Sequence, residues 1–100
     1  MVDIARPKFE PGRVVATPAA LQAITAAGQS PLQFLNRHTC GDWGELSPAD
    51  HTLNDEALSN GSRILSAYVT AGGRKIWIIT EAADDLGQRE ATTILLPEEY

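Results

Sequence analysis

The chain has 100 residues, the size of one small domain. Hydrophobic residues make up 43% of it and charged residues 21%, a globular composition that excludes disorder along the whole chain. Eight Lys and Arg against 13 Asp and Glu give a formal net charge of −5, which would repel a phosphate backbone and therefore argues against a nucleic-acid partner.

Cysteine content and hydropathy favour a cytoplasmic protein. Cys40 is the only cysteine, so no disulfide can form within the chain and a reducing compartment fits best. The first residues lack a basic region followed by a long apolar run, and no segment approaches the roughly 20 apolar residues of a membrane span. We therefore expect no membrane partner.

Two parts are predicted, an irregular arm over residues 1–13 and a single domain over residues 14–100. The arm contains Pro7, Pro11 and Gly12 and has no apolar periodicity. Residues 14–16, which follow it, read Val-Val-Ala and are a candidate for a short strand at the edge of a sheet.

Three short helices are predicted from one signal that occurs three times, a hydroxyl residue followed by proline. The hydroxyl can cap a helix, and proline favours the first helical position. Gly28 would end the first helix and Gly61 the third. The helix-starting pairs are Thr17-Pro18, Ser30-Pro31 and Ser47-Pro48.

The third of these helices is predicted to lie on the surface with one side buried. Residues 42–60 carry five acids and no Lys or Arg, which is typical of a solvated helix face. Asn54 is expected to face mostly outward with these acids. The buried side is predicted to be a narrow apolar stripe of Ala49, Leu53, Ala57 and Leu58.

After Gly61 the periodicity becomes that of strands. "RILSAYV" and "RKIWIIT" flank "AGG", which predicts a β-hairpin, and "ATTILL" predicts a further strand that ends at Pro97. The fold class is therefore α+β, with two or three N-terminal helices packed on a three-stranded antiparallel sheet, or a four-stranded one if residues 14–16 join it.

A two-residue turn at Gly72-Gly73 would decide which side chains share a face of this hairpin. The core face would then hold Leu65, Ala67, Val69, Ile76, Ile78 and Thr80. The opposite face, a candidate binding surface because it is amphipathic and aromatic, would hold Ser66, Tyr68, Thr70, Lys75, Trp77 and Ile79.

Several blocks of the chain resemble a family of small bacterial proteins found on plasmids and other mobile elements. The resemblance covers residues 14–100, and "GDWG" and "TTILLPEEY" are its specific motifs. Some members are labelled type I restriction-system components, a label that does not fit here because 100 residues leave no room for a methyltransferase domain. The loop 82–90 is longer than the family's usual connection. The resemblance implies an accessory protein of a mobile element.

The stretch "RHTCGDWGEL" brings together residue types found in metal and thiol sites. His38, Cys40, Asp42 and His51 are residue types that zinc accepts, but their spacing matches no zinc pattern, so we predict no bound metal and no cofactor. A thiolate at Cys40 would need an electropositive setting, whereas this segment is acidic. We favour a structural loop in which Asp42 bonds to nearby amides and Trp43 anchors the loop.

The enzymatic alternative is a metal-independent ribonuclease of the barnase or RelE type. His38 would carry the proton in such an enzyme, and Trp77 or Tyr68 would stack on a base. Arg37, Arg63, Arg74 or Lys75 would bind the phosphate. The hypothesis requires His38 to lie close to Arg63, Lys75 or Glu81.

As function we predict a non-enzymatic accessory or interaction protein of a bacterial mobile element, with a protein partner. Aromatic and arginine side chains are the usual anchors of such interfaces. The sequence leaves open whether the protein forms a homodimer. The predicted binding residues are Arg37, His38, Asp42, Trp43, Tyr68 and Trp77.

Overall fold

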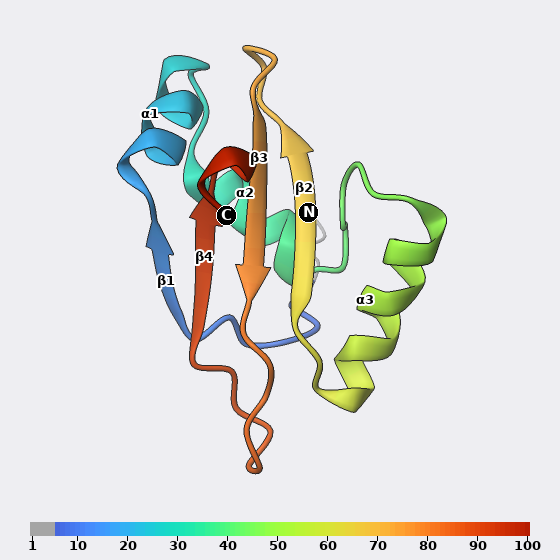
Figure 1. Cartoon of the computed structure of the whole chain (residues 1–100). Helices are drawn as coiled ribbons and strands as arrows, with labels where there is room; N and C mark the ends of the chain where they lie inside the picture. The colour runs from blue at the N-terminus through green and yellow to red at the C-terminus, as the bar shows by residue number, and fades with distance from the viewer. Residues whose placement is uncertain (1–5) are drawn as a thin grey trace, which may run out of the picture.

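The computed structural model describes residues 6–100, in which a four-stranded sheet is flanked by three helices (Figure 1). The sheet has the strand order β1-β4-β3-β2. The α+β prediction is confirmed. In chain order the elements are β1 (Arg13–Ala16), α1 (Pro18–Ala26), α2 (Pro31–Thr39), α3 (Pro48–Asn60), β2 (Ile64–Val69), β3 (Lys75–Thr80), β4 (Ala91–Leu95) and the 3-10 turn η1 (Pro97–Glu99).

All three predicted helices form, and each begins as its sequence indicates. The Oγ atoms of Thr17, Ser30 and Ser47 accept bonds from main-chain N–H groups in the first turns of α1, α2 and α3. Proline occupies the start of each helix, where its missing N–H costs no hydrogen bond. Gly61 ends α3 with a φ of 80°, a conformation that glycine adopts without strain.

The sheet is mixed, so the prediction of a purely antiparallel sheet is wrong. β1 joins as the fourth strand, but it runs parallel to β4, while β2, β3 and β4 are antiparallel neighbours. Thr17 N–H bonds to Ile94 O at the end of β1, which places the start of α1 directly beside the end of β4. The parallel direction therefore carries the chain from β1 straight into the helix that covers the sheet.

The hairpin also differs from its prediction, by one residue of register. Val69 pairs with Lys75 and Ala67 with Trp77, because the loop has three residues, 71–73, closed by Thr70 N–H bonding to Arg74 O. A two-residue turn at Gly72-Gly73, of either type favoured in hairpins, would need positive φ at Gly72, and of the two glycines only Gly73 has it. The extra residue exchanges the two faces of β2.

Ile64, Ser66 and Tyr68 therefore point to the core, and the prediction that Leu65, Ala67 and Val69 do so is wrong. We call the side of the sheet packed against α1 and α2 the covered face and the other side the open face (Figure 1). The covered face carries Ile64, Ser66, Tyr68, Ile76, Ile78, Thr80, Thr92 and Ile94. The open face carries Leu65, Ala67, Val69, Lys75, Trp77, Ile79, Thr93 and Leu95.

Two hydrophobic clusters lie on the covered side. The larger joins α1 and α2 to the sheet and includes Ile24, Phe34 and Tyr68. The smaller lies beside α3, where Trp43 packs with Ala57 and Ile64 and is bordered by Phe9 of the arm, Leu46 and Leu58. Residues 6–12 form neither helix nor strand, whereas Arg13, the last residue of the predicted arm, belongs to β1; residues 1–5 of that prediction lie outside the described residues.

The buried side of α3 is only partly the predicted apolar stripe. Ala57 is buried and Leu58 is half-buried, but Ala49 and Leu53 are exposed, whereas Asn54 is buried and bonds to β2 through both its amide nitrogen and its amide oxygen. Its Nδ2 donates to Leu65 O (2.6 Å), and its Oδ1 accepts from Leu65 N–H (3.2 Å). Asn54 faces inward because it satisfies main-chain groups at the edge of the sheet that would otherwise lack partners.

Candidate functional site

His38, the central residue of the ribonuclease hypothesis, lies inside the core. It belongs to the last turn of α2, which presses it against the covered face, and its side chain has no exposed surface. The ring's Nδ1 is 2.5 Å from Ser66 Oγ, and its Nε2 is 2.8 Å from Thr80 Oγ1. Both nitrogens are therefore occupied by hydroxyl groups of the sheet.

The proton positions in this network follow from counting donors. Thr92 Oγ1 donates its one proton to Pro11 O (2.7 Å), so the 2.7 Å bond between Thr80 and Thr92 must be donated by Thr80. Thr80 Oγ1 then accepts from His38 Nε2–H. His38 Nδ1 is left as an acceptor for the Ser66 hydroxyl. The His38 ring is therefore a neutral imidazole in which both nitrogens are hydrogen-bonded.

The surroundings of His38 also oppose its protonation. Burial, and secondarily the positive charge of Arg89, lower the pKa of His38 to about 3. A group that titrates so low stays neutral at physiological pH and is a poor proton carrier there. Its geometry is that of a structural core residue.

The structure does not bring the other predicted catalytic residues to His38. Arg63, Lys75 and Glu81 are all exposed, just before β2, at the start of β3 and just after β3. Arg63 instead donates to the Tyr100 hydroxyl (2.6 Å). His38, the proposed acid–base group, therefore does not lie together with Arg63, Lys75 or Glu81, as a ribonuclease site of this kind would require.

The "GDWG" loop is held against β2 by its main chain and by Gly44. Ala67 N–H bonds to Trp43 O (3.1 Å), and Glu45 N–H bonds to Ala67 O (2.7 Å). Gly44 has a φ of 77°, and a Cβ on it would overlap Ala67 O and lie 2.7 Å from the Tyr68 ring. Only glycine fits between the loop and the strand.

Side chains of the loop have structural partners as well. Trp43 is buried and donates through Nε1 to Asp55 of α3 (2.9 Å). Asp42 pairs with Arg37 at 2.7 Å, and this hydrogen bond raises the pKa of Arg37 and lowers the pKa of Asp42. The carbonyl of Asp42 accepts from the buried Tyr68 hydroxyl (2.6 Å). Burial raises the pKa of Tyr68.

The metal-type residues of the same stretch do not form a cage. Nowhere in residues 6–100 do three His, Cys, Asp or Glu side chains gather closely enough to bind one metal ion. His51 Nε2 lies 3.2 Å from Gly44 O, and Asp42 is engaged by Arg37. These residues hold the loop together.

The open face carries the exposed cluster best suited to binding. Trp77 projects from β3 and makes an edge-on contact with the ring of Tyr100, with 5.7 Å between centroids. Arg63 completes the cluster, because its Cζ lies 5.5 Å from the centre of the Tyr100 ring while its Nη1 bonds to the hydroxyl. Tyr100 keeps 66% of its surface exposed. We call these three residues the aromatic cluster.

A groove of about 440 Å³ lies beside Trp77 on this face. Leu65, Ala67 and Trp77 form an apolar floor along the strands. The charged residues of the groove are Glu45 and Asp50, near the start of α3, and Lys75 of β3. The groove thus combines an apolar floor with a mainly acidic rim.

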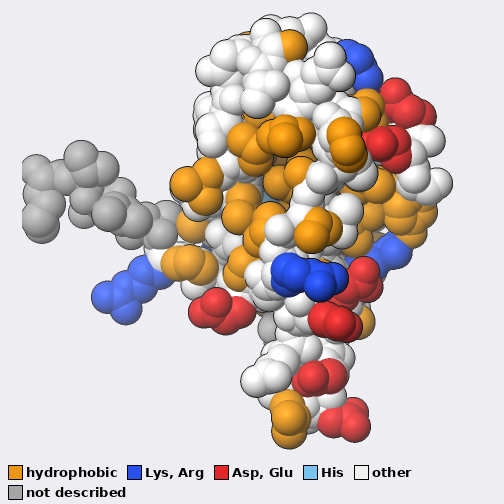
Figure 2. Space-filling view, turned by 90° about the vertical axis from the view of Figure 1, so that its left-hand side faces the viewer, with side chains coloured by type: hydrophobic (Ala, Val, Ile, Leu, Met, Phe, Trp, Pro, Cys, Tyr) orange, Lys and Arg blue, Asp and Glu red, His pale blue; other side chains and the backbone are white. Residues whose placement is uncertain are grey.

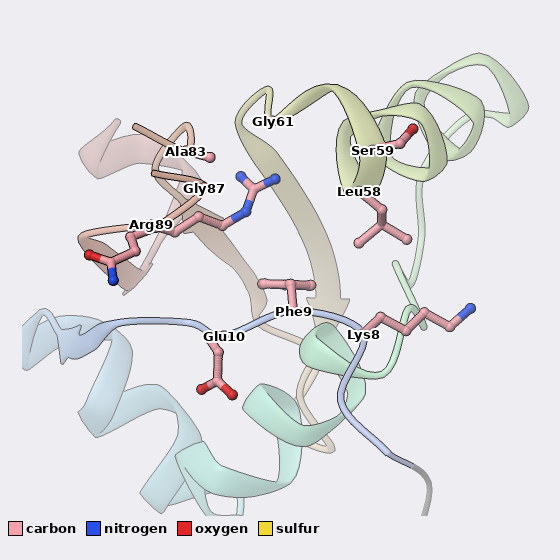
Figure 3. A pocket seen from close by; sticks show the side chains of 10 residues that line it. Lys8, Phe9, Glu10, Leu58, Ser59, Gly61, Ala83, Gly87 and Arg89 are labelled. Atoms are coloured by element: carbon pink, nitrogen blue, oxygen red, sulfur yellow. The ribbon is translucent and has the colours of Figure 1, made fainter. Parts of the chain in front are cut away.

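A second pocket, of about 530 Å³, lies between the arm, the end of α3 and the loop before β4 (Figure 3). Arg89 projects across it toward α3, above the Phe9 ring. Its guanidinium donates to Ser62 O (2.7 Å), Ala57 O (2.9 Å) and Glu81 O (3.0 Å). Burial lowers the pKa of Arg89, but the side chain is already engaged in closing the end of α3.

Of the predicted binding residues, only Trp77 belongs to the aromatic cluster. Tyr68 was expected beside it and lies on the covered face, because of the change of register. Tyr100 was missed, although "LLPEEY" contains a signal for it: Pro97 begins a turn that folds the last residue back onto the sheet. Arg89 and Asn54 were missed because nothing local marks a side chain that bonds to distant main-chain groups.

Comparison of the chain with protein-family models, with curated proteins and with solved structures found no match. None of the helices described is both long enough and apolar enough to cross a bilayer.

Proposed function

We propose that this protein is a non-enzymatic interaction protein whose open face binds a protein partner. The observation that carries the proposal is the aromatic cluster, since tryptophan, tyrosine and arginine are the residues most enriched where binding energy concentrates in interfaces. Trp77 and Tyr100 are held in place by contact with one another, so little side-chain entropy is lost when a partner covers them.

The groove beside the cluster indicates the chemistry of the partner. Two carboxylates, Glu45 and Asp50, border an apolar floor that continues to Trp77. A segment with an apolar side chain for the floor and a Lys or Arg for the rim would match both features. We therefore infer a partner that presents a basic, partly apolar segment.

On the sequence resemblance alone, we further propose a role as a cytoplasmic accessory protein of a mobile element. The ribonuclease hypothesis takes second place, because His38 is buried, neutral and on the side of the sheet opposite the aromatic cluster. Cleavage of RNA by the wild-type protein would reverse this order.

Affinity capture from host lysate, with the protein as bait, tests the proposal. Arg63→Glu and Trp77→Ala change the aromatic cluster, and Leu86→Ala is the control, because Leu86 is 82% exposed on the loop before β4. We expect one or more proteins retained by the wild type and the control and lost from both cluster variants. Variants with unchanged circular dichroism that retain the same proteins as the wild type would contradict the proposal.

A further inference from the structure

The two edges of the sheet differ in whether their outward main-chain groups are hydrogen-bonded. At the β2 edge, the outward main-chain groups of Leu65 bond to Asn54, and those of Ala67 bond to Trp43 and Glu45. This edge is closed to another strand. Proteins commonly protect an edge in this way, because unpaired N–H and C=O groups attract other strands.

Among residues 6–100, nothing closes the β1 edge in this way. Arg13 N–H bonds to Glu90 O and Thr17 N–H bonds to Ile94 O, so the odd-numbered residues of β1 direct their main-chain groups toward β4. Successive residues of a strand alternate, which points the N–H and C=O groups of Val14 and Ala16 outward. β1 is the last strand of the sheet, and no hydrogen bond within residues 6–100 reaches these groups.

The side chains of β1 are exposed as well. Val14 and Val15 each keep 40% of their surface exposed. Figure 2, which views the molecule from the side that β1 borders, shows hydrophobic side chains gathered over the middle of that side. An apolar edge with free main-chain groups is suited to pairing with another strand.

We propose that β1 pairs with β1 of a second copy of this chain, antiparallel about a two-fold axis at Val15. Val14 of each copy then lies opposite Ala16 of the other, and their outward groups exchange four hydrogen bonds. The larger Val14 side chain faces the smaller Ala16, and the two Val15 side chains meet at the axis. At the end where β1 runs into α1 the pairing leaves no orphan donor, because Pro18, the first residue of α1, has no N–H.

Charge complementarity favours a second copy of this chain as the molecule that pairs with the β1 edge. The same alignment places Arg13 opposite Thr17 of the other copy, and Thr17 Oγ1 donates to Glu99 (2.7 Å). Arg13, Val15 and Thr17 share one side of the strand, so the Arg13 guanidinium comes within reach of that carboxylate. Within residues 6–100 neither Arg13 nor Glu99 forms an ion pair. The symmetry supplies this contact twice.

The size of the contact sets the strength of the dimer. A stable interface buries about 800 Å² on each partner, and a four-residue edge strand supplies only part of that. The dimer is therefore weak and forms at high protein concentration, and its continuous sheet has eight strands.

Sedimentation equilibrium on the whole chain, at concentrations up to about 1 mM, tests the pairing. Val14→Pro removes an outward N–H without touching the bonds to β4, and Val14→Thr, which keeps the N–H and the branched shape, is its control. We expect a dimer for the wild type and Val14→Thr, and a dissociation constant raised at least about tenfold in Val14→Pro.

Arg13→Glu supplies a second variant in case Val14→Pro fails to fold. It places like charges opposite each other and is expected to weaken the dimer by a similar factor, whereas Trp77→Ala, on the open face away from the β1 edge, should dimerise as the wild type does. A protein that stays monomeric at every concentration overturns the proposal. So does a dimer that neither Val14→Pro nor Arg13→Glu weakens.

Discussion

The two faces of the sheet use polar side chains in opposite ways. On the covered face, Ser66, Thr80 and Thr92 meet His38 in a buried network, and no buried side-chain nitrogen or oxygen of the described residues lacks a hydrogen bond. On the open face, Arg63 and Tyr100 bond to each other but remain exposed. Chemically versatile residues can thus be structural when buried, while the surface suited to binding is built from an arginine and two aromatic rings.

The largest loss of stability is expected from Gly44→Ala, because Gly44 lies where the "GDWG" loop packs against β2. The added methyl group would overlap Ala67 O and press on the Tyr68 ring. We expect a loss of about 3 kcal/mol or more in the free energy of unfolding, measured by urea denaturation.

Gly87→Ala is the matched control for this change. Gly87 has nearly the same φ, 78°, but open space around it, so only the backbone strain of about 1 kcal/mol should appear. Equal losses in the two variants would show that Gly44 matters for its backbone conformation and not for the close approach to β2.

His38→Gln tests the buried network at an intermediate size of effect. The amide can replace part of the bonding to Ser66 and Thr80, so we expect a loss of about 2 kcal/mol at pH 7.5. The same substitution at His51, which makes one long bond, should cost well under about 1 kcal/mol. A His38 variant as stable as the wild type would contradict the structural role.

The pH dependence of the stability difference between the wild type and His38→Gln provides a second test. The pKa of His38 is lowered from 6.5 to about 3 in the folded state, so the unfolded state binds the proton first as the pH falls. The wild type should therefore lose stability relative to His38→Gln below pH 6.5, by about 1.4 kcal/mol per pH unit. A stability difference that does not change between pH 7 and pH 4 would mean that the ring is not kept neutral.

The smallest effect on stability is expected on the open face. Arg63→Ala removes an exposed hydrogen bond and a cation–π contact with Tyr100, together worth about 1 kcal/mol or less. Urea denaturation of this variant measures that cost directly. A loss as large as that of Gly44→Ala would show that the aromatic cluster is part of the folding core, which would weaken the proposal that it serves binding.

Much of the fold was predictable, because local signals decided it. Each hydroxyl-proline pair starts a helix through bonds within its own first turn. Runs with strand periodicity, rich in β-branched and aromatic residues, predicted all three strands after Gly61. The candidate site was predictable only in part. Trp77 was predicted to lie beside Tyr68, but the aromatic ring that contacts it is Tyr100, since the hairpin loop has one residue more than its glycines suggested.

By itself, the sequence determined where the helices and strands lie, since caps, turns and periodicity act over a few residues. Only the tertiary structure decided how these elements and their side chains are oriented. It set the register of β2, the direction of β1, the burial of His38 and the inward orientation of Asn54. The physical reason is that these features depend on hydrogen bonds and packing between residues far apart in the chain. A local pattern contains no information about which distant partner a side chain will find.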